Sequence, residues 1–265
     1  MQATPQLAEI KLPNVRKLFL PDPGHVLLDV DLSGADAQVV AWEAQDDNLK
    51  SAFKAGLNIH NHNGKTIWGD NYTIDGKRPG AKYTMRDECK RAVHATNYGT
   101  SARTLAVTLG WKISEAETFI NRWLTRLHPA IGDWHDRVDY NLKTTRTITN
   151  AFGYRIVYFD RVDALLPTAL AWTPQSTVAL VCSKGGINIR KIPWVELLKQ
   201  VHDSLVFQIP IHRFTPANLA VIQRHLEVEV PYPNDPLLIP WEASYSLKSW
   251  GDVEKFKWSM EGVAI

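Results

Sequence analysis

The sequence predicts an α+β fold in which strands from both ends of the chain share one sheet and a helical segment is inserted between them. Three observations support this prediction. Residues 26–32 have the pattern of a strand, and residues 194–209 contain two apolar runs around a tight turn. Most of the chain between these two segments follows helical spacing instead.

The composition is that of a globular protein with a large core. The 265 residues are 45% hydrophobic and include ten tryptophans, which suits one large domain or two interleaved subdomains. The longest apolar runs, such as residues 177–182, are far shorter than the roughly 20 residues that span a bilayer. The first residues have no signal-peptide pattern. We therefore expect a soluble, cytoplasmic protein that does not contact a membrane.

The cysteine count and the net charge exclude few classes of function. Cys89 and Cys182 are too few for a disulfide framework or a four-cysteine zinc site. The net charge is +2, but residues 82–146 contain eleven Lys and Arg against seven Asp and Glu, so 11 − 7 = +4 lies in the middle of the chain. Such a segment fits either a polyanionic ligand or an ordinary solvated helical surface.

The first strand is expected after the turn residues Pro-Asp-Pro-Gly at 21–24. Its period of two places Asp29 and Asp31 on one face, where two carboxylates are costly unless a positive group meets them. A helix is expected from Asp36 to Ala55, ended by Gly56.

The sequence pattern in the middle of the chain predicts several helices. Ser114 and Glu117 have capping-box spacing before an amphipathic helix that runs until Pro129. A second helix is expected through Trp134 and Val138, followed by a hairpin at 148–159.

The last third predicts a helix, a strand pair and another helix. The first helix is expected over 163–184, kinked or split by Pro167 and Pro174 and stopped by the glycine pair at 185–186. A strand, tight turn and strand then cover 194–209. Thr215 and Pro216 have the chemistry of a helix start, and this helix is expected to reach about residue 229.

The first segment that carries chemistry is Asp31 to Gln38, in which a carboxylate at a strand end is followed five residues later by Asp36. Magnesium is typically held by one or two carboxylates together with substrate phosphates. Alone, this pattern is equally typical of a helix cap.

The second segment contains Arg86, Lys90, His94 and Tyr98-Gly99, with four residues between successive side chains. Steps of four drift by only about 40° on a helix, so the side chains share one face. A guanidinium and an ammonium group one turn apart suit the phosphates of a nucleoside triphosphate, and an aromatic ring can stack on a base. A solvent-exposed basic face would give the same pattern.

The third segment is His202-Asp203-Ser204, a turn between two apolar strands. Its carboxylate is expected at a hairpin tip, although these residues are also ordinary turn formers.

Together and in this order, the three segments resemble motifs A, B and C of family A DNA polymerases, the bacterial polymerase-I-like and phage enzymes. The resemblance extends over nearly the whole chain. Further similar segments are residues 13–24 before motif A, Ile59-His60, the Pro-Gln-Ser-Thr run at 174–177 and Ser-Trp-Gly at 249–251.

The resemblance implies a DNA-directed DNA polymerase core with an antiparallel palm sheet over approximately 1–54 and 146–265, and helical fingers over approximately 55–145. It implies two Mg²⁺ ions bound by Asp31, Asp203 and the backbone carbonyl of Leu32. The implied partners are a DNA primer-template and deoxynucleoside triphosphates. Its implied roles are as follows: catalysis by Asp31, Asp203 and Lys90, nucleotide binding by Arg86, Lys90, His94, Tyr98, Asp36 and His60, and DNA binding by Gln175, His202, Tyr98 and Gly99.

Several positions depart from the family pattern. Asp36 stands where the family usually has the longer Glu that excludes a 2′-hydroxyl, so we expect weaker discrimination against ribonucleotides. His94 stands where the family has Phe or Tyr. Ser204 replaces an acidic residue of the family pattern, and Gln38 replaces an Arg. The family's thumb and exonuclease domains lie upstream of motif A, where this sequence has about 30 residues. A fragment, a minimal core, or a separate chain that supplies the thumb or exonuclease would each account for this.

Two alternatives stay open at this point. A single-subunit, phage-type RNA polymerase shares the basic helix and the His-Asp-Ser turn, although Asp36 argues against it because those enzymes have a small residue there. A non-catalytic, polymerase-like DNA-binding subunit is the second alternative, and the retention of both aspartates argues against it.

Overall fold

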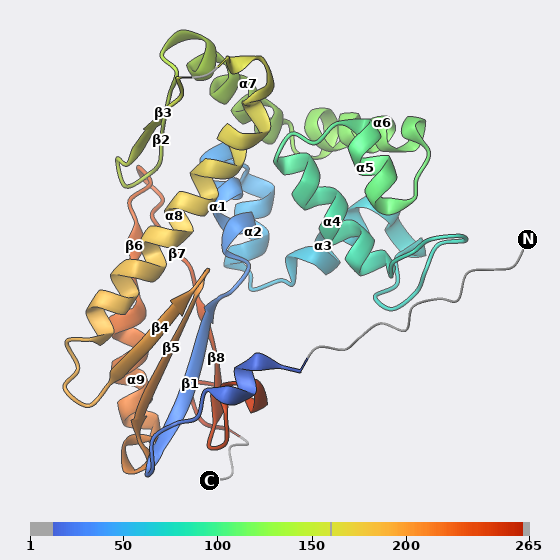
Figure 1. Ribbon diagram of the computed structural model, residues 1–265. Helices are drawn as coiled ribbons and strands as arrows, with labels where there is room; N and C mark the ends of the chain where they lie inside the picture. The colour runs from blue at the N-terminus through green and yellow to red at the C-terminus, as the bar shows by residue number, and fades with distance from the viewer. Residues whose placement is uncertain (1–12, 160, 262–265) are drawn as a thin grey trace, which may run out of the picture. The chain divides into compact units, whose positions relative to one another are not determined.

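The computed structural model describes residues 13–159 and 161–261. The chain divides into two compact units (Figure 1). The first unit is formed by residues 1–32, 182–227 and 240–265, and the second by residues 33–181 and 228–239. Each unit therefore contains segments that are far apart in the sequence.

The first unit is built on a five-stranded antiparallel sheet with the strand order β4-β5-β1-β8-β9. The strands are β1 (His25–Leu32), β4 (Glu196–Val201), β5 (Ser204–Pro210), β8 (Trp241–Ser246) and β9 (Glu254–Phe256). Strand β1 lies in the centre of the sheet, between β5 and β8. Four of its residues are therefore completely buried: Val26, Leu27, Leu28 and Val30. Together with the helices, this sheet confirms the predicted α+β class.

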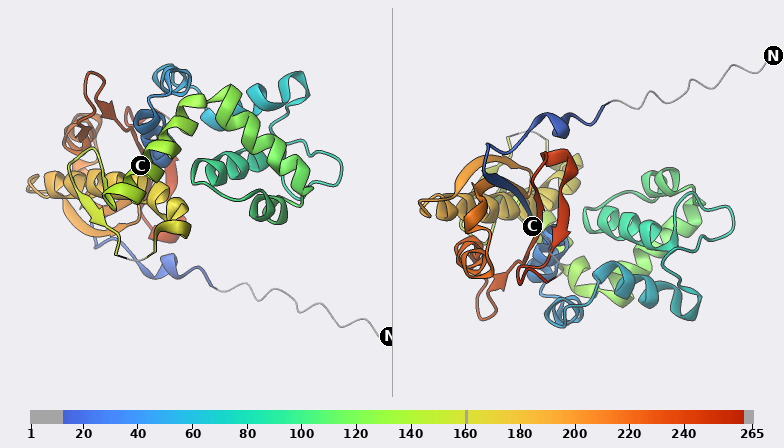
Figure 2. Two further views of the ribbon diagram at one scale, coloured as in Figure 1. Left: turned by 90° about the horizontal axis from the view of Figure 1, so that it is seen from above. Right: turned by 90° about the horizontal axis from the view of Figure 1, so that it is seen from below.

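Helical segments pack along the sheet in this unit, as Figures 1 and 2 show. Helix α9 (Pro216–Leu226) begins where the sequence predicted, because Thr215 Oγ1 accepts a hydrogen bond from the amide of Asn218 at 3.4 Å. Another such segment is the C-terminal part of α8 (Leu166–Ile189). A short 3-10 helix, η6 (Trp250–Asp252), precedes β9, and η1 (Val15–Leu18) precedes β1.

The predicted stop at Gly185-Gly186 is wrong, because α8 continues through both glycines to Ile189. Their function is close packing. A Cβ atom on Gly185 would lie 3.2 Å from the ring of Trp241, and one on Gly186 would lie 3.3 Å from Leu205. The glycine pair therefore allows the helix to approach the sheet closely. Pro174 also lies inside the helix without splitting it.

The second unit consists mainly of helices. They are α1 (Ala35–Ala44), α2 (Asp47–Lys54), α3 (Ile59–Trp68), α4 (Met85–Asn97), α5 (Ala102–Leu109), α6 (Ile113–Arg122), α7 (Pro129–Thr144) and the N-terminal part of α8. Two hairpins, β2 (Thr147–Thr149) with β3 (Arg155–Val157) and β6 (Glu229–Val230) with β7 (Leu237–Leu238), complete it. Short helical turns are η2 (Gly69–Asn71), the π-helix η3 (Trp123–Leu127) and η4 (Val162–Ala164), while η5 (Ile211–Arg213) belongs to the first unit.

Two local predictions in this unit are wrong. The single helix expected over 36–55 is divided into α1 and α2, because Gln45 adopts a left-handed φ of 58° and Asp46 caps the second helix through Leu49 N at 2.9 Å. The capping box at Ser114 does not form, because α6 already begins at Ile113 after Lys112.

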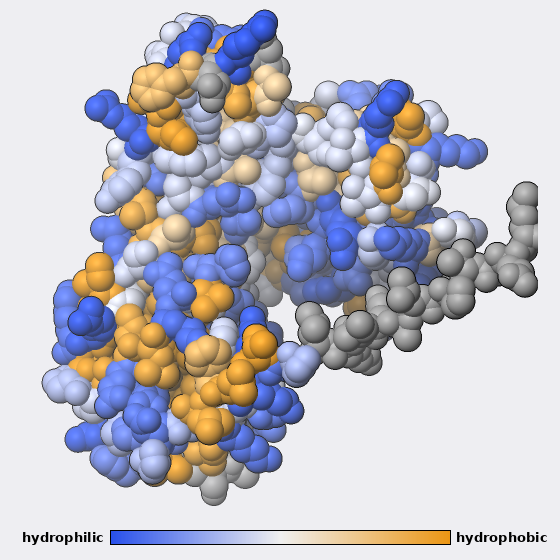
Figure 3. All heavy atoms as spheres, viewed as in Figure 1, coloured by the Kyte–Doolittle hydropathy of each residue, from blue (hydrophilic) through white to orange (hydrophobic). Residues whose placement is uncertain are grey.

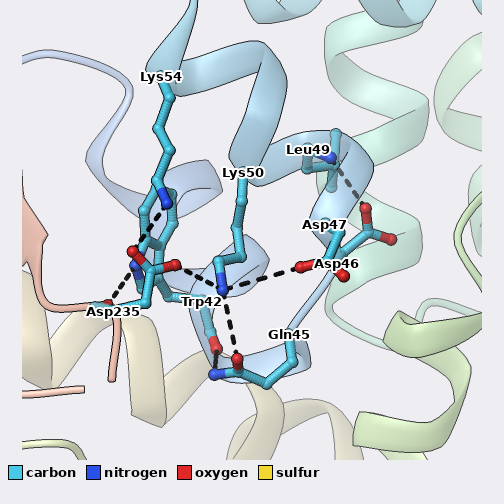
Figure 4. Close-up of polar contacts among 8 residues, drawn as sticks. All are labelled: Trp42, Gln45, Asp46, Asp47, Leu49, Lys50, Lys54 and Asp235. Atoms are coloured by element: carbon cyan, nitrogen blue, oxygen red, sulfur yellow. Dashed lines mark hydrogen bonds and ion pairs between the residues drawn. The ribbon is translucent and has the colours of Figure 1, made fainter. Parts of the chain in front are cut away.

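A buried lysine joins the segment 228–239 to α1 and α2 (Figure 4). Lys50 Nζ lies 2.6 Å from an Asp235 carboxylate oxygen, and its side chain is only 8% exposed. The indole of Trp42 donates to the backbone carbonyl of Asp235 at 2.8 Å. Lys54 binds the other Asp235 oxygen at the same distance. Asp235 thus fixes a segment that is distant in sequence.

Among the described residues, no helix combines the length and apolar character that crossing a membrane requires.

Candidate active site

The first cluster of predicted site residues lies at one end of the central strand. Asp31 is opposite Ser204 of β5 and opposite Glu242 of β8. The amide of Leu32 donates to the carbonyl oxygen of Asp203 at 3.2 Å. The antiparallel register therefore brings Asp31 and Asp203 together, although 172 positions separate them in the sequence.

The hairpin turn that carries Asp203 is tight. His202 adopts a positive φ of 54°, which is uncommon for a residue other than glycine. The hydroxyl of Ser204 donates to the carbonyl of Val201 at 3.1 Å and closes the turn. Val206 and Phe207 of the following strand are buried, so the apolar strand anchors a polar tip.

The electrostatics of this cluster are unfavourable without a cation. Partial burial, together with the neighbouring carboxylates of Asp203, Asp29 and Glu242, raises the pKa of Asp31 to about 6. Every charge that acts on Asp31 in this way is negative. Burial, together with the carboxylates of Asp203 and Asp31, raises the pKa of Cys182 to about 12.

This arrangement fits a hard divalent cation. Asp29 is occupied elsewhere, since one of its oxygens accepts from the indole of Trp250 at 2.7 Å. Within residues 13–159 and 161–261, no three His, Cys, Asp or Glu side chains are grouped to hold a metal. Asp31 and Asp203 alone, however, supply the one or two carboxylates that magnesium usually takes from a protein.

The second cluster of predicted site residues lies on α4 in the helical unit. Thr84 caps this helix through the amide of Asp87 at 3.2 Å. Lys90 and His94 are exposed and Arg86 is half-buried, whereas Cys89 and Val93 on the opposite face are buried. In the part of the chain that the structure describes, Arg86 makes a single long ion pair of 3.8 Å, with Asp87, so its guanidinium is available for an anion.

His60 of α3 lies beside this row and is uncharged at neutral pH. Burial, together with the charges of Lys90 and Arg86, lowers its pKa to about 4. Burial also lowers the pKa of His94, although Asp36 opposes this effect. Both imidazoles are therefore hydrogen-bonding groups rather than fixed positive charges.

Tyr98 connects the end of α4 to α1. Its hydroxyl donates to an Asp36 carboxylate oxygen at 2.9 Å, and its ring meets the His94 ring edge-on with centroids 4.6 Å apart. Gly99 follows with a φ of +69°, and a Cβ there would lie 3.0 Å from Leu170. A larger residue would thus be both strained and crowded.

The structure brings most of the predicted site residues into two groups. Asp31, Leu32, His202 and Asp203 belong to the sheet unit, and Asp36, His60, Arg86, Lys90, His94, Tyr98 and Gly99 belong to the helical unit. Gln175 is exposed on α8, apart from the α4 row in sequence. His202 is exposed at its turn.

Sequence reasoning missed Glu242, which faces Asp31 across the β1–β8 pairing. The sequence signal that could have found Glu242 is the alternation of the apolar residues Trp241 and Ala243 with polar neighbours, which is typical of a half-buried strand. It also gave no role to Trp250, whose indole binds Asp29.

Comparisons with known proteins agree with this geometry. The model for "DNA polymerase family A" matches residues 1–252. The thermostable DNA polymerase I of Thermus filiformis is 30% identical over 83% of this chain, and the DNA polymerase of Mycobacterium phage D29 is 27% identical over 90%. The chain spans only 26% and 37% of the length of these two relatives.

A solved structure shares the fold. The POL domain of Pol1 from M. smegmatis, in complex with DNA primer-template and dNTP, superimposes with a TM-score of 0.76 and 22% identity. The match covers 90% of this chain and 42% of that one. With a family match over nearly its entire length, the chain belongs to DNA polymerase family A.

Proposed function

We propose that this chain catalyses template-directed addition of deoxynucleotides to a primer 3′-end, with release of pyrophosphate. The observation that carries the proposal is the meeting of Asp31 and Asp203 in a cluster of carboxylates, where partial burial and the neighbouring negative charges raise the pKa of Asp31 to about 6. Such a cluster needs a cation, and a polymerase supplies one together with the nucleotide. Family membership supports the same reaction.

The carboxylates of Asp31 and Asp203 and the carbonyl of Leu32 would hold two Mg²⁺ ions. When bound, these ions would activate the primer hydroxyl and neutralise charge on the triphosphate. The role of the protein is to fix both carboxylates before the substrate arrives, which the backbone bond between Leu32 and Asp203 supports.

The basic row on α4 would bind the triphosphate. Arg86 and Lys90 present a guanidinium and an ammonium group one helical turn apart. Lys90 would protonate the departing pyrophosphate, and His60 would donate a hydrogen bond as a neutral ring. His94 and Tyr98 would pack against the sugar and base, with Asp36 beside the 2′-position.

The remaining proposed roles concern DNA. Gln175 and His202 would contact the duplex near the primer terminus, and Tyr98 with Gly99 would lie beside the templating base. The sheet segments at approximately 1–54 and 146–265 would form the palm, and approximately 55–145 the fingers. A primer-template and deoxynucleoside triphosphates would be the partners.

Extension of a labelled primer on a DNA template with Mg²⁺ tests the proposal. Wild type should extend with deoxynucleotides, and Asp203→Asn should lose activity while retaining its fold by circular dichroism. Glu254→Ala is the matched control, because this exposed carboxylate lies in the same sheet on β9. Equal activity of Asp203→Asn and wild type would refute the metal role, and preferential extension with ribonucleotides would favour an RNA polymerase.

Lys90→Arg tests the proton transfer separately. Arginine preserves the positive charge but is a poor acid, since its pKa exceeds 12. A general acid typically contributes about 10²–10⁴ to the rate, so we expect kcat to fall by about 10² or more while the KM for nucleotide changes little. An unchanged kcat in single-turnover measurements would exclude this role for Lys90.

A further inference from the structure

A pocket in the helical unit is lined by none of the residues assigned to the proposed reaction. Its volume is about 520 Å³, within the range of roughly 300–1,000 Å³ that is typical of pockets for small molecules. Helices α2 and α3 each contribute part of the lining, and the end of η3 with the residue after it contributes another part. The lining includes Ser51, Leu57, His62, Arg126, Leu127 and His128.

The part of the lining that contains His128 is held in place by a buried polar contact. His128 Nδ1 lies 2.9 Å from Asp46 Oδ2, and both side chains are only 4% exposed. Asp46 also caps α2 through the amide of Leu49 (Figure 4). The His128 ring packs on buried Trp123 with centroids 4.2 Å apart. The start of α2 and the start of α7 are thereby tied together beside the pocket.

The same imidazole has a second nitrogen without a partner. Among the described residues, His128 Nε2 is buried and makes no hydrogen bond. A buried polar atom in this state costs free energy and is uncommon in native structures. Because Asp46 holds Nδ1, Nε2 is the nitrogen that remains for a ligand.

The charge of the lining is positive. No Asp or Glu is among the lining residues, and Arg126 makes no ion pair with any residue that the structure describes. The carboxylate of Asp46 is already bound by His128 and by the first turn of α2. Leu57 and Leu127 add apolar surface to the same pocket. The lining therefore suits an anionic group attached to an apolar body.

We propose that this pocket binds a small organic phosphate whose apolar part is about the size of one aromatic ring. The guanidinium of Arg126 would bind two phosphate oxygens, since its planar fork matches that geometry. His62, Ser51 and His128 Nε2 would contact the remaining oxygens. Donors on three parts of the lining fit a tetrahedral phosphate better than a planar carboxylate, which has only two oxygens.

Isothermal titration calorimetry of the full chain with phenyl phosphate tests the inference. Arg126→Ala should bind at least about tenfold more weakly than wild type, because a charge-assisted contact is lost. Arg103→Ala is the matched control and should bind like wild type, since this exposed arginine of α5 does not line the pocket. Benzoate should bind more weakly than phenyl phosphate, and uncharged benzyl alcohol should bind most weakly of the three.

Leu57→Ser tests the apolar side of the pocket. Leu57 is 48% exposed, so the substitution should leave the fold intact, and thermal unfolding without ligand checks this. Affinity for phenyl phosphate should fall by about threefold through the lost apolar contact. Affinity for inorganic phosphate should not change. An equal fall for both ligands would exclude an apolar contact at Leu57 and overturn the proposed ligand class.

The basic row on α4 is the competing site for a phosphate. In the space-filling view, hydrophilic residues gather over α3 and α4 (Figure 3). Arg86→Ala should leave the binding of phenyl phosphate unchanged. Weakening by Arg86→Ala but not by Arg126→Ala would place the ligand on the row and refute the pocket site.

Two further results would also overturn the inference. One is equal affinity of wild type and Arg126→Ala, and the other is no binding to wild type at about 10 mM phenyl phosphate. None of these measurements depends on primer extension, so the pocket site and the proposed polymerisation succeed or fail separately.

Discussion

The amide of Leu32 donates a hydrogen bond to the backbone carbonyl of Asp203 at 3.2 Å. This bond continues the ladder in which Asp31 faces Ser204. The position of the two carboxylates is therefore set by backbone pairing between segments distant in sequence. Changing either side chain leaves the backbone donor and acceptor intact, so substitutions at Asp31 or Asp203 test chemistry more than folding.

Asp31→Asn should stabilise the protein at pH 7.5 in the absence of divalent cations. The folded-state pKa of about 6 lies above the ordinary value of 3.8, so the folded protein binds more protons than the unfolded one between these values. The contribution of Asp31 to stability is thus full below pH 4 and lost as the pH rises through 6. Urea unfolding should show a gain at pH 7.5 that disappears at pH 4. An equal gain at both pH values would show that the effect is not electrostatic.

Mg²⁺ should reverse the stability order of wild type and Asp31→Asn. A ligand that binds only the folded state raises its stability, so millimolar Mg²⁺ should increase the Tm of wild type. Asp31→Asn should respond less, because the substitution removes a carboxylate ligand. Glu254→Ala should respond like wild type. A wild-type Tm that is insensitive to Mg²⁺ would contradict metal binding by the free protein.

Asp36→Glu should improve discrimination against ribonucleotides. Asp36 is held by the Tyr98 hydroxyl at 2.9 Å, and the added methylene would move the carboxylate closer to a 2′-hydroxyl. The ratio of kcat/KM for a deoxynucleotide to that for the matching ribonucleotide should rise about tenfold, which corresponds to about 1.4 kcal/mol. A wild-type ratio equal to or above that of the variant would refute the steric role of Asp36.

The sequence was sufficient to predict the strands that carry Asp31 and Asp203 and the shared face of Arg86, Lys90 and His94. These predictions succeed because strand and helix periods fix which side chains share a face. Glu242 could not be assigned, since it reaches Asp31 only through the register of a third strand. Gly185 and Gly186 were misjudged as a helix end, because their close approach to Trp241 and Leu205 is a tertiary feature.

Charge states were the second property that the sequence could not supply. Burial, together with the charges of Lys90 and Arg86, lowers the pKa of His60 below its usual range. This effect depends on the arrangement of α3 beside α4, which the sequence alone does not give. His60, which the resemblance assigned to nucleotide binding, is therefore a neutral hydrogen-bonding group at pH 7.

Arg78→Ala should strongly destabilise the helical unit. Arg78 binds both oxygens of Glu88, at 2.9 and 2.8 Å, and the side chain of Glu88 is completely buried. Loss of the guanidinium leaves a buried carboxylate that still accepts a hydrogen bond from the indole of Trp111. Removing one member of a buried pair typically costs about 3 kcal/mol or more. Lys77→Ala, at an exposed neighbouring position, should stay within about 0.5 kcal/mol of wild type in the same urea titration.

The Lys50–Asp235 pair should respond asymmetrically to the loss of its two members. Among the described residues, Asp235→Ala leaves the buried ammonium of Lys50 with Gln45 Oε1 at 3.3 Å and Asp47 at 4.0 Å. Lys50→Met removes that charge and packs a similar volume near the ring of Trp42, while Asp235 keeps Lys54 at 2.8 Å. We therefore expect a larger fall in Tm for Asp235→Ala than for Lys50→Met.

The double variant makes this expectation sharper. Once Lys50 is methionine, removal of Asp235 no longer strands a buried charge, so the two losses should not add. Thermal unfolding of all four proteins of the cycle should show Asp235→Ala as the least stable, with the double variant above it. Additive losses would mean that the Asp235 side chain stabilises the segment 228–239 mainly through Lys54, and not through Lys50.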